Sequence, residues 1–186
     1  MMKFTPLSIP GLILVEPQVF GDERGFFMET YSKKEFADAG ITVDFVQDNH
    51  SRSTQGVLRG LHFQKPPFAQ AKLVQVTHGE VLDVAVDIRP DSPTFGKYDT
   101  AHLTAENKKM FFIPEGFAHG FHVLTETADF QYKCSNFYNK ESEGGLLWND
   151  PDINIAWLAA SPSLSEKDKL WPKLKDIETE LKALKW

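Results

Sequence analysis

Apolar and polar positions alternate along most of the chain. In the stretch VLDVAVDI (81–88) every even position is apolar, whereas Asp83 and Asp87 occupy odd positions. In ADFQYKCSNFY (128–138) the even positions up to Cys134 are apolar or aromatic, and the odd ones are polar. A period of two residues is typical of β-strands. Further strands are predicted at 11–16, 26–31, 44–50, 57–64, 71–77, 98–104, 110–113 and 119–125.

Turn residues separate these strands, as in RPDSPTFG (89–96). Many short strands at regular spacing predict an all-β fold, an antiparallel sandwich or barrel. Helical patterns occur in two segments only, over 32–40 and in the last twelve residues. We expect the second helix at about 175–185, packing on the barrel or on a partner subunit. No internal repeat or linker is visible, so we expect a single domain over 1–186 with small peripheral helices.

Composition narrows the class of protein. The 186 residues are 41% hydrophobic and 25% charged, with a net charge of -6. That balance is ordinary for a globular protein and argues against nucleic-acid binding, although a local basic pocket is compatible with it. Cys134 is the single cysteine, so no internal disulfide can form, as is typical of a reducing compartment. We find no signal peptide and no apolar stretch near the length of a membrane span, and we therefore expect a cytoplasmic protein without membrane contact.

Three predicted strands each carry one proton-active group on an apolar face. Lys72 alternates with valines, His119 with phenylalanines, and Tyr132 lies between Phe130 and Cys134. A lone buried histidine or tyrosine is more often a hydrogen-bonded core residue than a functional one. A lysine is almost never buried unpaired, so Lys72 needs an anionic partner or a wet cavity. The three together favour a lined pocket.

The segment GVLRGLHFQ (56–64) places Arg59 and His62 in an apolar strand beside glycines. Strict alternation puts the two side chains on opposite faces. Both can reach one pocket only if Gly60 bends or bulges the strand, as strand glycines often do. The alternative is that one of them is a surface residue.

The segment PEGFAH (114–119) resembles the second motif of the cupin superfamily, which raises the question of a metal site. The first cupin motif normally supplies two histidines and a glutamate, whereas this chain has His62 followed by Gln64. Two histidines without a clear third ligand are a poor zinc or iron site. We therefore expect a cupin-type barrel without metal or other cofactor. A metal cupin that recruits a glutamate from elsewhere is the alternative.

Five longer segments carry a closer resemblance: DERGFFMETY (22–31), QDNHSRSTQGVLRGLHFQ (47–64), QAKLVQVTHGEVLDVAVDIRPDSPTFG (70–96), FIPEGFAHGF (112–121) and LSEKDKLWPKL (164–174). Together they resemble the dTDP-4-dehydrorhamnose 3,5-epimerase family, over nearly the whole chain. The resemblance implies a cofactor-free, homodimeric, cupin-like jelly roll. It also implies inversion of carbons 3 and 5 of dTDP-4-dehydro-6-deoxy-D-glucose, giving dTDP-4-dehydro-L-rhamnose in dTDP-L-rhamnose biosynthesis.

The same resemblance implies roles for individual residues. His62 corresponds to the base, Asp168 to the carboxylate that orients it, Lys72 to the group that stabilises the enolate, and Tyr132 to the acid. The implied substrate-binding residues are Arg24, Phe27, Glu29, Gln47, Asn49, Arg59, His119, Tyr138 and Lys167. Asp168 has a plainer interpretation as a helix-cap carboxylate, because Ser165 stands three residues before it. Phe63 and Tyr138 are small departures from the family pattern.

Other functions are compatible with the same residues. The base and acid could serve an epimerase that acts at carbon 3 or carbon 5 alone. The barrel could be a sugar-nucleotide or small-ligand binding protein without activity. A metal-dependent cupin, for example a dioxygenase, is the fourth possibility.

Overall fold

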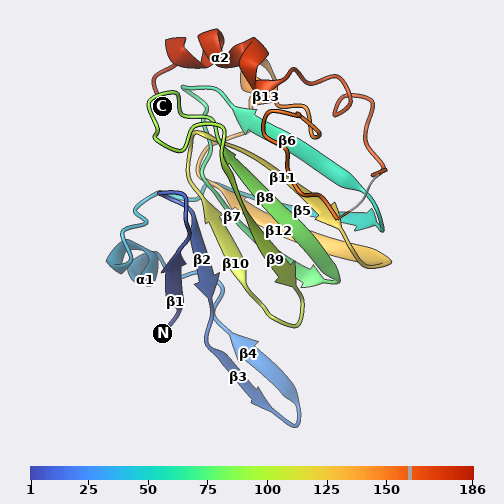
Figure 1. Ribbon diagram of the computed structural model, residues 1–186. Helices are drawn as coiled ribbons and strands as arrows, with labels where there is room; N and C mark the ends of the chain where they lie inside the picture. The colour runs from blue at the N-terminus through green and yellow to red at the C-terminus, as the bar shows by residue number, and fades with distance from the viewer. Residues whose placement is uncertain (159–160) are drawn as a thin grey trace.

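Two antiparallel β-sheets form the body of the molecule in the computed structural model, which describes residues 1–158 and 161–186 (Figure 1). The six-stranded sheet has the order β1 (Lys3–Pro6), β2 (Ile13–Glu16), β10 (Met110–Ile113), β7 (Lys72–His78), β12 (Thr127–Cys134), β5 (Gln47–Thr54). The five-stranded sheet has the order β13 (Glu143–Gly145), β6 (Leu58–Gln64), β11 (Phe117–Val123), β8 (Glu80–Asp87), β9 (Tyr98–Thr104). The predicted all-β jelly-roll class is confirmed.

Most predicted strands lie within three residues of their observed positions. The segment predicted at 44–50 forms β5 three residues later, and the strand begun at 128 ends at Cys134 rather than at 138. Three strands were not predicted, namely β1, β3 (Val19–Asp22) and β13. Each is only three or four residues long and contains a proline or a glycine, residues that favour turns over strands.

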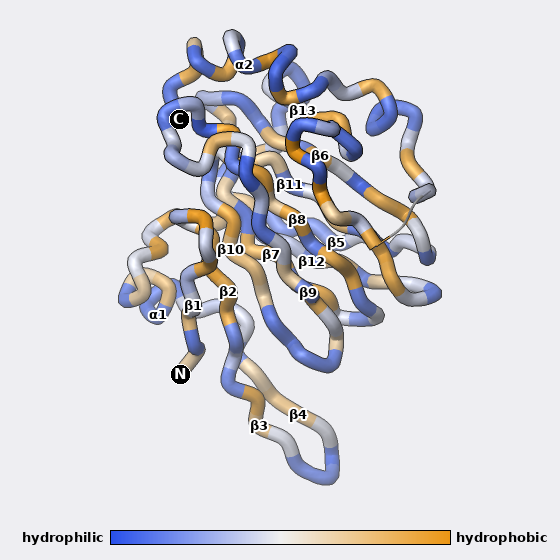
Figure 2. Tube along the Cα trace, viewed as in Figure 1, coloured by the Kyte–Doolittle hydropathy of each residue, from blue (hydrophilic) through white to orange (hydrophobic). Residues whose placement is uncertain are grey.

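The main core fills the space between the two sheets. Val74 and Phe130 from the six-stranded sheet pack there with Val81 and Phe121 from the five-stranded sheet. The outer face of each sheet is also covered: α1 (Lys33–Asp38) packs Phe36 on the six-stranded sheet, and α2 (Leu174–Ala183) packs on the five-stranded one. Figure 2 shows the resulting apolar stretches along the central strands. The central strands are therefore buried on both faces, and alternation alone does not identify their inner face.

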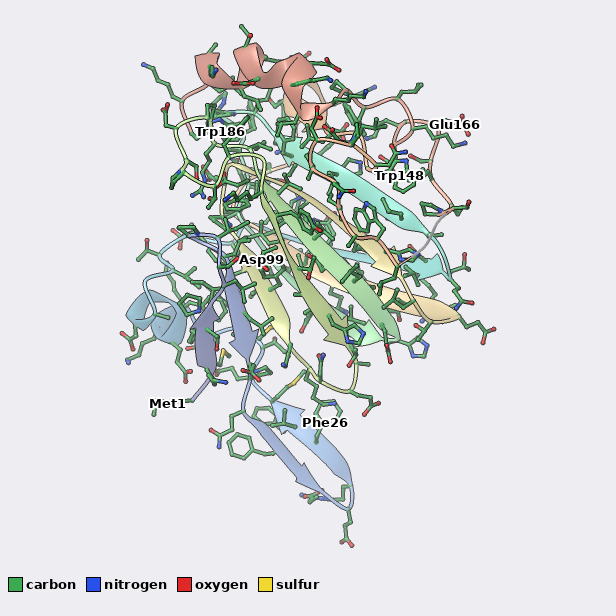
Figure 3. All side chains as sticks on the ribbon, viewed as in Figure 1. Met1, Phe26, Asp99, Trp148, Glu166 and Trp186 are labelled. Carbon is green, nitrogen blue, oxygen red and sulfur yellow. The ribbon has the colours of Figure 1, made fainter. Side chains whose placement is uncertain are left out.

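The hairpin formed by β3 and β4 (Gly25–Met28) stands apart from both sheets and projects from the body (Figure 1). Its aromatic side chains are open to solvent: Phe20, Phe26 and Phe27 are all exposed. Figure 3 shows Phe26 on this projection, at the opposite end of the molecule from Glu166.

The C-terminal segment crosses the five-stranded sheet before it reaches α2. Ser163 makes an isolated bridge to Val57, and this contact brings the following residues beside β6. Within the described residues, no helix has the length and apolar character needed to span a membrane.

Candidate active site

Two adjoining hollows of about 380 and 480 Å³ lie between the sheets and share His62, Lys72 and Tyr132 among their lining residues. We refer to them together as the cleft. Ten of the thirteen residues predicted for the site line it: His62, Lys72, Tyr132, Asp168, Arg59, His119, Lys167, Gln47, Asn49 and Tyr138. The volume is in the range of small-molecule sites. The fold thus brings together groups that are more than a hundred residues apart in the chain.

A break in β6 explains how Arg59 and His62 both reach the cleft. The pairing of β11 with β6 shifts register between His119 and Phe121. Gly60, opposite this shift, has φ of 125°. A Cβ atom on Gly60 would lie 2.6 Å from the Cα of Gly120, so no larger residue fits. The bulge required by the sequence analysis is present, and it turns both side chains toward one cavity.

His62 and Asp168 form a hydrogen-bonded pair. The His62 Nε2 donates to Asp168 Oδ1 at 2.6 Å, which leaves Nδ1 as the basic nitrogen. Trp171 Nε1 donates to the same carboxylate oxygen at 3.3 Å. Burial opposes ionisation of Asp168, but the hydrogen bond and charge of His62 outweigh it and hold the pKa of the carboxyl below its usual value. Ser165 Oγ accepts from the Asp168 N–H, so Ser165 caps this turn while the carboxylate remains free to bind His62.

Lys72 and Tyr132 lie side by side on neighbouring strands of the opposite sheet, where Tyr132 pairs with Val74. Burial lowers the pKa of Lys72, and Cys134, Asp83 and Glu143 oppose that shift. Of these three, the carboxylates carry the relevant charge, because burial raises the pKa of the Cys134 thiol. Burial also raises the pKa of Tyr132, which keeps the phenol protonated at neutral pH.

A second histidine–carboxylate pair lies deeper in the cleft. His119 Nε2 lies 3.0 and 2.9 Å from the two oxygens of Asp83, on the adjacent strand β8. Burial raises the pKa of Asp83 and lowers that of His119, while each partner opposes the shift of the other. His119 borders the larger hollow, and Asp83 lies directly behind it.

Charged and polar groups surround the mouth of the cleft. Arg59 Nε donates to Ser53 Oγ at 3.0 Å. Lys167 Nζ donates to Glu143 at 2.6 Å, and the Tyr138 hydroxyl donates to the same carboxylate at 3.3 Å. Of these groups only Glu143 is acidic, so the mouth has more positive than negative charge.

Gln64 occupies the position where a cupin would have a second histidine. Its amide makes three hydrogen bonds with backbone atoms, to Phe68 O at 2.7 Å, Phe137 O at 3.1 Å and from Asn139 N at 2.6 Å. The side chain therefore holds two loops together. In the described part of the chain, no cluster of three or more histidine, cysteine or acidic residues is arranged to hold a metal ion.

Arg24, Phe27 and Glu29 are not brought to the cleft of their own chain. Arg24 and Phe27 lie around a shallow hollow on the β3–β4 hairpin, where Arg24 is paired with Asp22. Glu29 follows the hairpin directly and does not line the cleft. These three residues are the only predicted ones that stand outside it.

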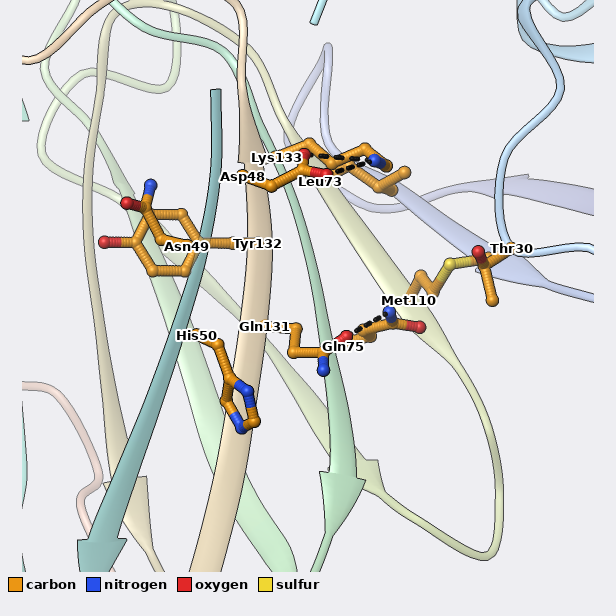
Figure 4. Close-up of a pocket in the computed structure, with 10 residues that line it drawn as sticks. All are labelled: Thr30, Asp48, Asn49, His50, Leu73, Gln75, Met110, Gln131, Tyr132 and Lys133. Carbon is orange, nitrogen blue, oxygen red and sulfur yellow. Dashed lines mark hydrogen bonds and ion pairs between the residues drawn. The ribbon is translucent and has the colours of Figure 1, made fainter. Parts of the chain in front are cut away.

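A further hollow of about 330 Å³ lies on the outer face of the six-stranded sheet. Figure 4 shows Asn49 and Tyr132 on one side of β12, with Gln75, Gln131 and Met110 on the other. Gln75 donates to Gln131 at 3.2 Å, and Lys133 pairs with Asp48. Four polar groups of this hollow are thus bonded in pairs, and Asn49 and Tyr132 border both this hollow and the cleft.

Sequence reasoning did not identify three residues of the site. Asp83 was placed on the polar face of β8, although that face points into the sandwich. Glu143 lies in β13, which is too short to be recognised. Trp171 owes its position to Gly145, where a Cβ atom would lie 2.4 Å from the indole ring. Of the three, only Asp83 could have been identified from the sequence, because it alternates with the apolar residues Val81 and Ala85. Both of these are buried in the structure.

Comparison with known proteins agrees with this geometry. The family model described as dTDP-4-dehydrorhamnose 3,5-epimerase matches residues 6–176. The chain is 56% identical over 178 residues to a dTDP-4-dehydrorhamnose 3,5-epimerase of Shigella flexneri, covering 95% of this chain and 98% of that one.

Two solved structures show the fold of related proteins and the ligands bound to them. The dTDP-6-deoxy-D-glucose-3,5-epimerase of Legionella pneumophila, in complex with dTDP-4-keto-L-rhamnose, superposes with a TM-score of 0.93 at 49% identity, over 97% of each chain. A 3'-monoepimerase of Streptomyces bikiniensis, in complex with dTDP-quinovose, superposes with a TM-score of 0.89 at 36% identity, over 96% of this chain and 91% of that one. The arrangement of the cleft, the family match and these similarities lead to one conclusion: the chain belongs to the dTDP-4-dehydrorhamnose 3,5-epimerase family.

Proposed function

We propose that this protein inverts carbons 3 and 5 of dTDP-4-dehydro-6-deoxy-D-glucose and yields dTDP-4-dehydro-L-rhamnose, by proton transfer alone. One observation carries the proposal: a histidine–carboxylate pair, a lysine and a tyrosine border the same cleft. The C–H bonds on either side of a ketone are acidic because the ketone oxygen accepts the electron pair. Inversion at these carbons therefore requires a base, an acid and a cation, and it requires neither oxidation nor reduction.

His62 removes the proton. Its Nε2–H is held by Asp168, so Nδ1 has the lone pair that accepts the substrate proton. The imidazolium that forms is stabilised by the Asp168 carboxylate, which its hydrogen bonds keep ionised at neutral pH in spite of burial. The electron pair of the broken C–H bond moves to the ketone oxygen and gives an enolate.

Lys72 stabilises the enolate, and Tyr132 returns a proton to carbon. A cation beside a developing oxyanion in a dry site is worth about 2.7–4 kcal/mol in comparable sites. The raised pKa of Tyr132 keeps its hydroxyl protonated, so that it can donate from the face opposite His62. His62 then releases its proton to solvent and the Tyr132 phenolate takes one up, and the cycle repeats at the second carbon.

The diphosphate and the base of the substrate would lie toward the mouth of the cleft. Arg59 and Lys167 suit the phosphate oxygens, since guanidinium and ammonium groups bind phosphate through charged hydrogen bonds. Tyr138 is exposed at the same mouth and offers a ring on which thymine can stack. Gln47 and Asn49 supply amide groups nearby.

A homodimer is part of the proposal. The β3–β4 hairpin exposes three phenylalanines and holds Arg24 and Phe27 away from the cleft of its own chain. A second copy would bury these rings, and the hairpin could then reach the cleft of the partner. Light scattering should give twice the mass of one chain, and Phe26→Asp with Phe27→Asp should shift it toward the monomer. We also place the protein in the cytoplasm, which the single cysteine supports.

Deuterium incorporation tests the activity directly. The protein is incubated with dTDP-4-dehydro-6-deoxy-D-glucose in deuterated water, and the sugar is analysed by NMR. The proposal expects deuterium at both carbon 3 and carbon 5. Incorporation at neither carbon by the folded protein would leave only a binding role.

The similarity to a 3'-monoepimerase favours a second candidate, an epimerase that acts at one carbon. We predict that Tyr132→Phe cripples the double inversion and leaves exchange at carbon 3 detectable. Deuterium at one carbon with the unaltered protein would establish the single-site candidate, and loss of all exchange in the variant would exclude Tyr132 as the returning acid.

A further inference from the structure

The second histidine–carboxylate pair has no role in the steps described above, and its partners indicate one. Asp83 is completely buried, and His119 is nearly so. A buried carboxylate is costly unless its oxygens are bonded. Both oxygens of Asp83 lie within 3.0 Å of the same His119 nitrogen, so Nε2 is the protonated nitrogen and Nδ1 is free. Asp83 therefore determines the tautomer of His119.

Lys72 is the other group that responds to Asp83. The lysine and the carboxylate stand on opposite sheets and meet at His119: Lys72 and His119 border the same hollow, and Asp83 is bonded to His119. The charge of Asp83 opposes the fall in the Lys72 pKa that burial causes. Burial alone would favour an uncharged Lys72, and an uncharged amine could not stabilise an enolate. The cleft around the lysine has nine other titratable or charged groups. They are Arg59 and His62 on β6, His119 on β11, Tyr132 and Cys134 on β12, Tyr138 after β12, Glu143 on β13, and Lys167 and Asp168 in the C-terminal segment.

Most of these neighbours cannot supply the counter-charge. Arg59 and Lys167 are cations, and Lys167 already pairs with Glu143. Asp168 is bonded to His62 and Trp171. Tyr132 and Cys134 are neutral near pH 7, because burial raises the pKa of each. Two carboxylates act on Lys72 through their charge, Asp83 and Glu143. Of these two, Asp83 is the one without a lysine or arginine partner among the described residues.

We propose that Asp83 is a positioning residue that acts through both of its neighbours: it holds His119 in the tautomer with Nδ1 free, and it keeps Lys72 protonated beside the substrate ketone. This inference rests on the proposed function for its consequence in catalysis. Its electrostatic part concerns Lys72 alone and can be measured without turnover.

The test compares Asp83→Asn with Asp87→Asn. The asparagine at 83 keeps the shape and an oxygen acceptor for His119, so it removes mainly the charge. Asp87 is the matched control, since it is also completely buried on β8, but it bonds to Arg89, Ser92 and Thr94 rather than to the cleft. Both variants lose one buried carboxylate from the same strand.

The first readout is the pH dependence of Lys72 labelling by an amine-reactive reagent, followed by peptide mass spectrometry. A charge of opposite sign at a few ångströms moves a pKa by about one to three pH units. We expect Asp83→Asn to shift the midpoint of Lys72 labelling to lower pH by about that amount, and Asp87→Asn to leave it in place. An unchanged midpoint in folded Asp83→Asn would overturn the proposal.

The second readout is kcat and KM against pH. Loss of the Lys72 charge should move the alkaline limb of kcat to lower pH in Asp83→Asn, with little change in KM at low pH. A uniform loss of kcat at every pH, without a shifted limb, would mean that Asp83 is merely structural. If the variant does not fold, Lys72 labelling of the unaltered protein decides the question, since a lysine that is already uncharged at pH 7 would overturn the proposal. Inactivity of the unaltered protein would refute the proposed function and leave the labelling result standing.

Discussion

The two histidine–carboxylate pairs of the cleft use the same side chains in different surroundings. The His62 side chain is 30% exposed, and its partner Asp168 comes from a distant segment of the chain. The His119 side chain is 8% exposed, and its partner Asp83 is on the adjacent strand of the same sheet. An imidazole that takes a proton from a substrate must be accessible to that substrate. An imidazole that contributes to the local electrostatic field must be held in one orientation. The two pairs contain the same residue types, so it is solvent access that distinguishes their chemistry.

The substitution with the largest expected effect removes the more exposed imidazole, that of His62. For His62→Ala we expect kcat to fall by about 10²–10⁴-fold, because a positioned base contributes that much, while dTDP still binds. Added imidazole should restore part of the activity, since the space left is open to solvent. The measurement is turnover by NMR, with calorimetry for dTDP binding.

A surface pair provides the control for that experiment. His102 Nε2 lies 3.1 Å from Glu80 on the outside of the five-stranded sheet, and both side chains are exposed. His102→Ala should retain the full rate. A near-normal rate in His62→Ala would remove His62 from its role, and rescue of a His119→Ala variant by imidazole would show that access does not distinguish the two pairs.

Asp168→Asn tests the partner rather than the base. We expect kcat to fall by about 10²–10⁴-fold, the upper limit being the loss when the orienting carboxylate of a serine-protease triad becomes an amide.

The same variant should also be less sensitive to unfolding by acid. Because the pKa of Asp168 is lowered by folding, its ionised form stabilises the fold above the unfolded pKa of about 3.9, and this contribution is lost as the pH falls below that value.

Urea unfolding at pH 7 and pH 3 measures that second effect. The unaltered protein should lose more stability between these values than Asp168→Asn does. Equal losses would mean that the carboxylate contributes nothing to acid sensitivity, in spite of its hydrogen bonds.

Gly145→Ala should have the smallest effect of the three substitutions. A methyl group at this position collides with the Trp171 ring, whose N–H donates to Asp168. Overpacking of this kind costs about 1–3 kcal/mol, measured by the free energy of unfolding. We expect kcat to fall about tenfold as the carboxylate loses one donor. Gly21→Ala, on the open hairpin, is the matched control, because neither Gly21 nor Gly145 has a positive φ and a Cβ atom on Gly21 would meet only the Gly25 carbonyl oxygen, at an ordinary 3.6 Å. A larger catalytic loss in the Gly21 variant would point to the hairpin instead.

Alternation along the chain predicted most strands and the inward positions of Lys72, His119 and Tyr132, because side chains of a strand point to opposite faces in turn. It placed Asp83 opposite the all-apolar face of β8 and did not show that this second face also points into the sandwich, since β8 is covered on both faces. The short strands β1, β3 and β13 left no period to detect. The assignment of Asp168 to His62 came from family resemblance, and no local pattern supports a contact across 106 positions.

The sequence by itself determined the all-β class, the approximate strand positions and the residue types available for proton transfer. These depend on local hydrophobic pattern, which a linear chain records directly. Tertiary structure alone decided that a bulge at Gly60 turns Arg59 and His62 into one cleft, that Asp168 meets His62, and that Asp83 lies behind His119. Each of these features joins residues that are distant in the chain, through strand pairing within the five-stranded sheet or through the C-terminal segment beside β6, so its energy arises only in the folded chain.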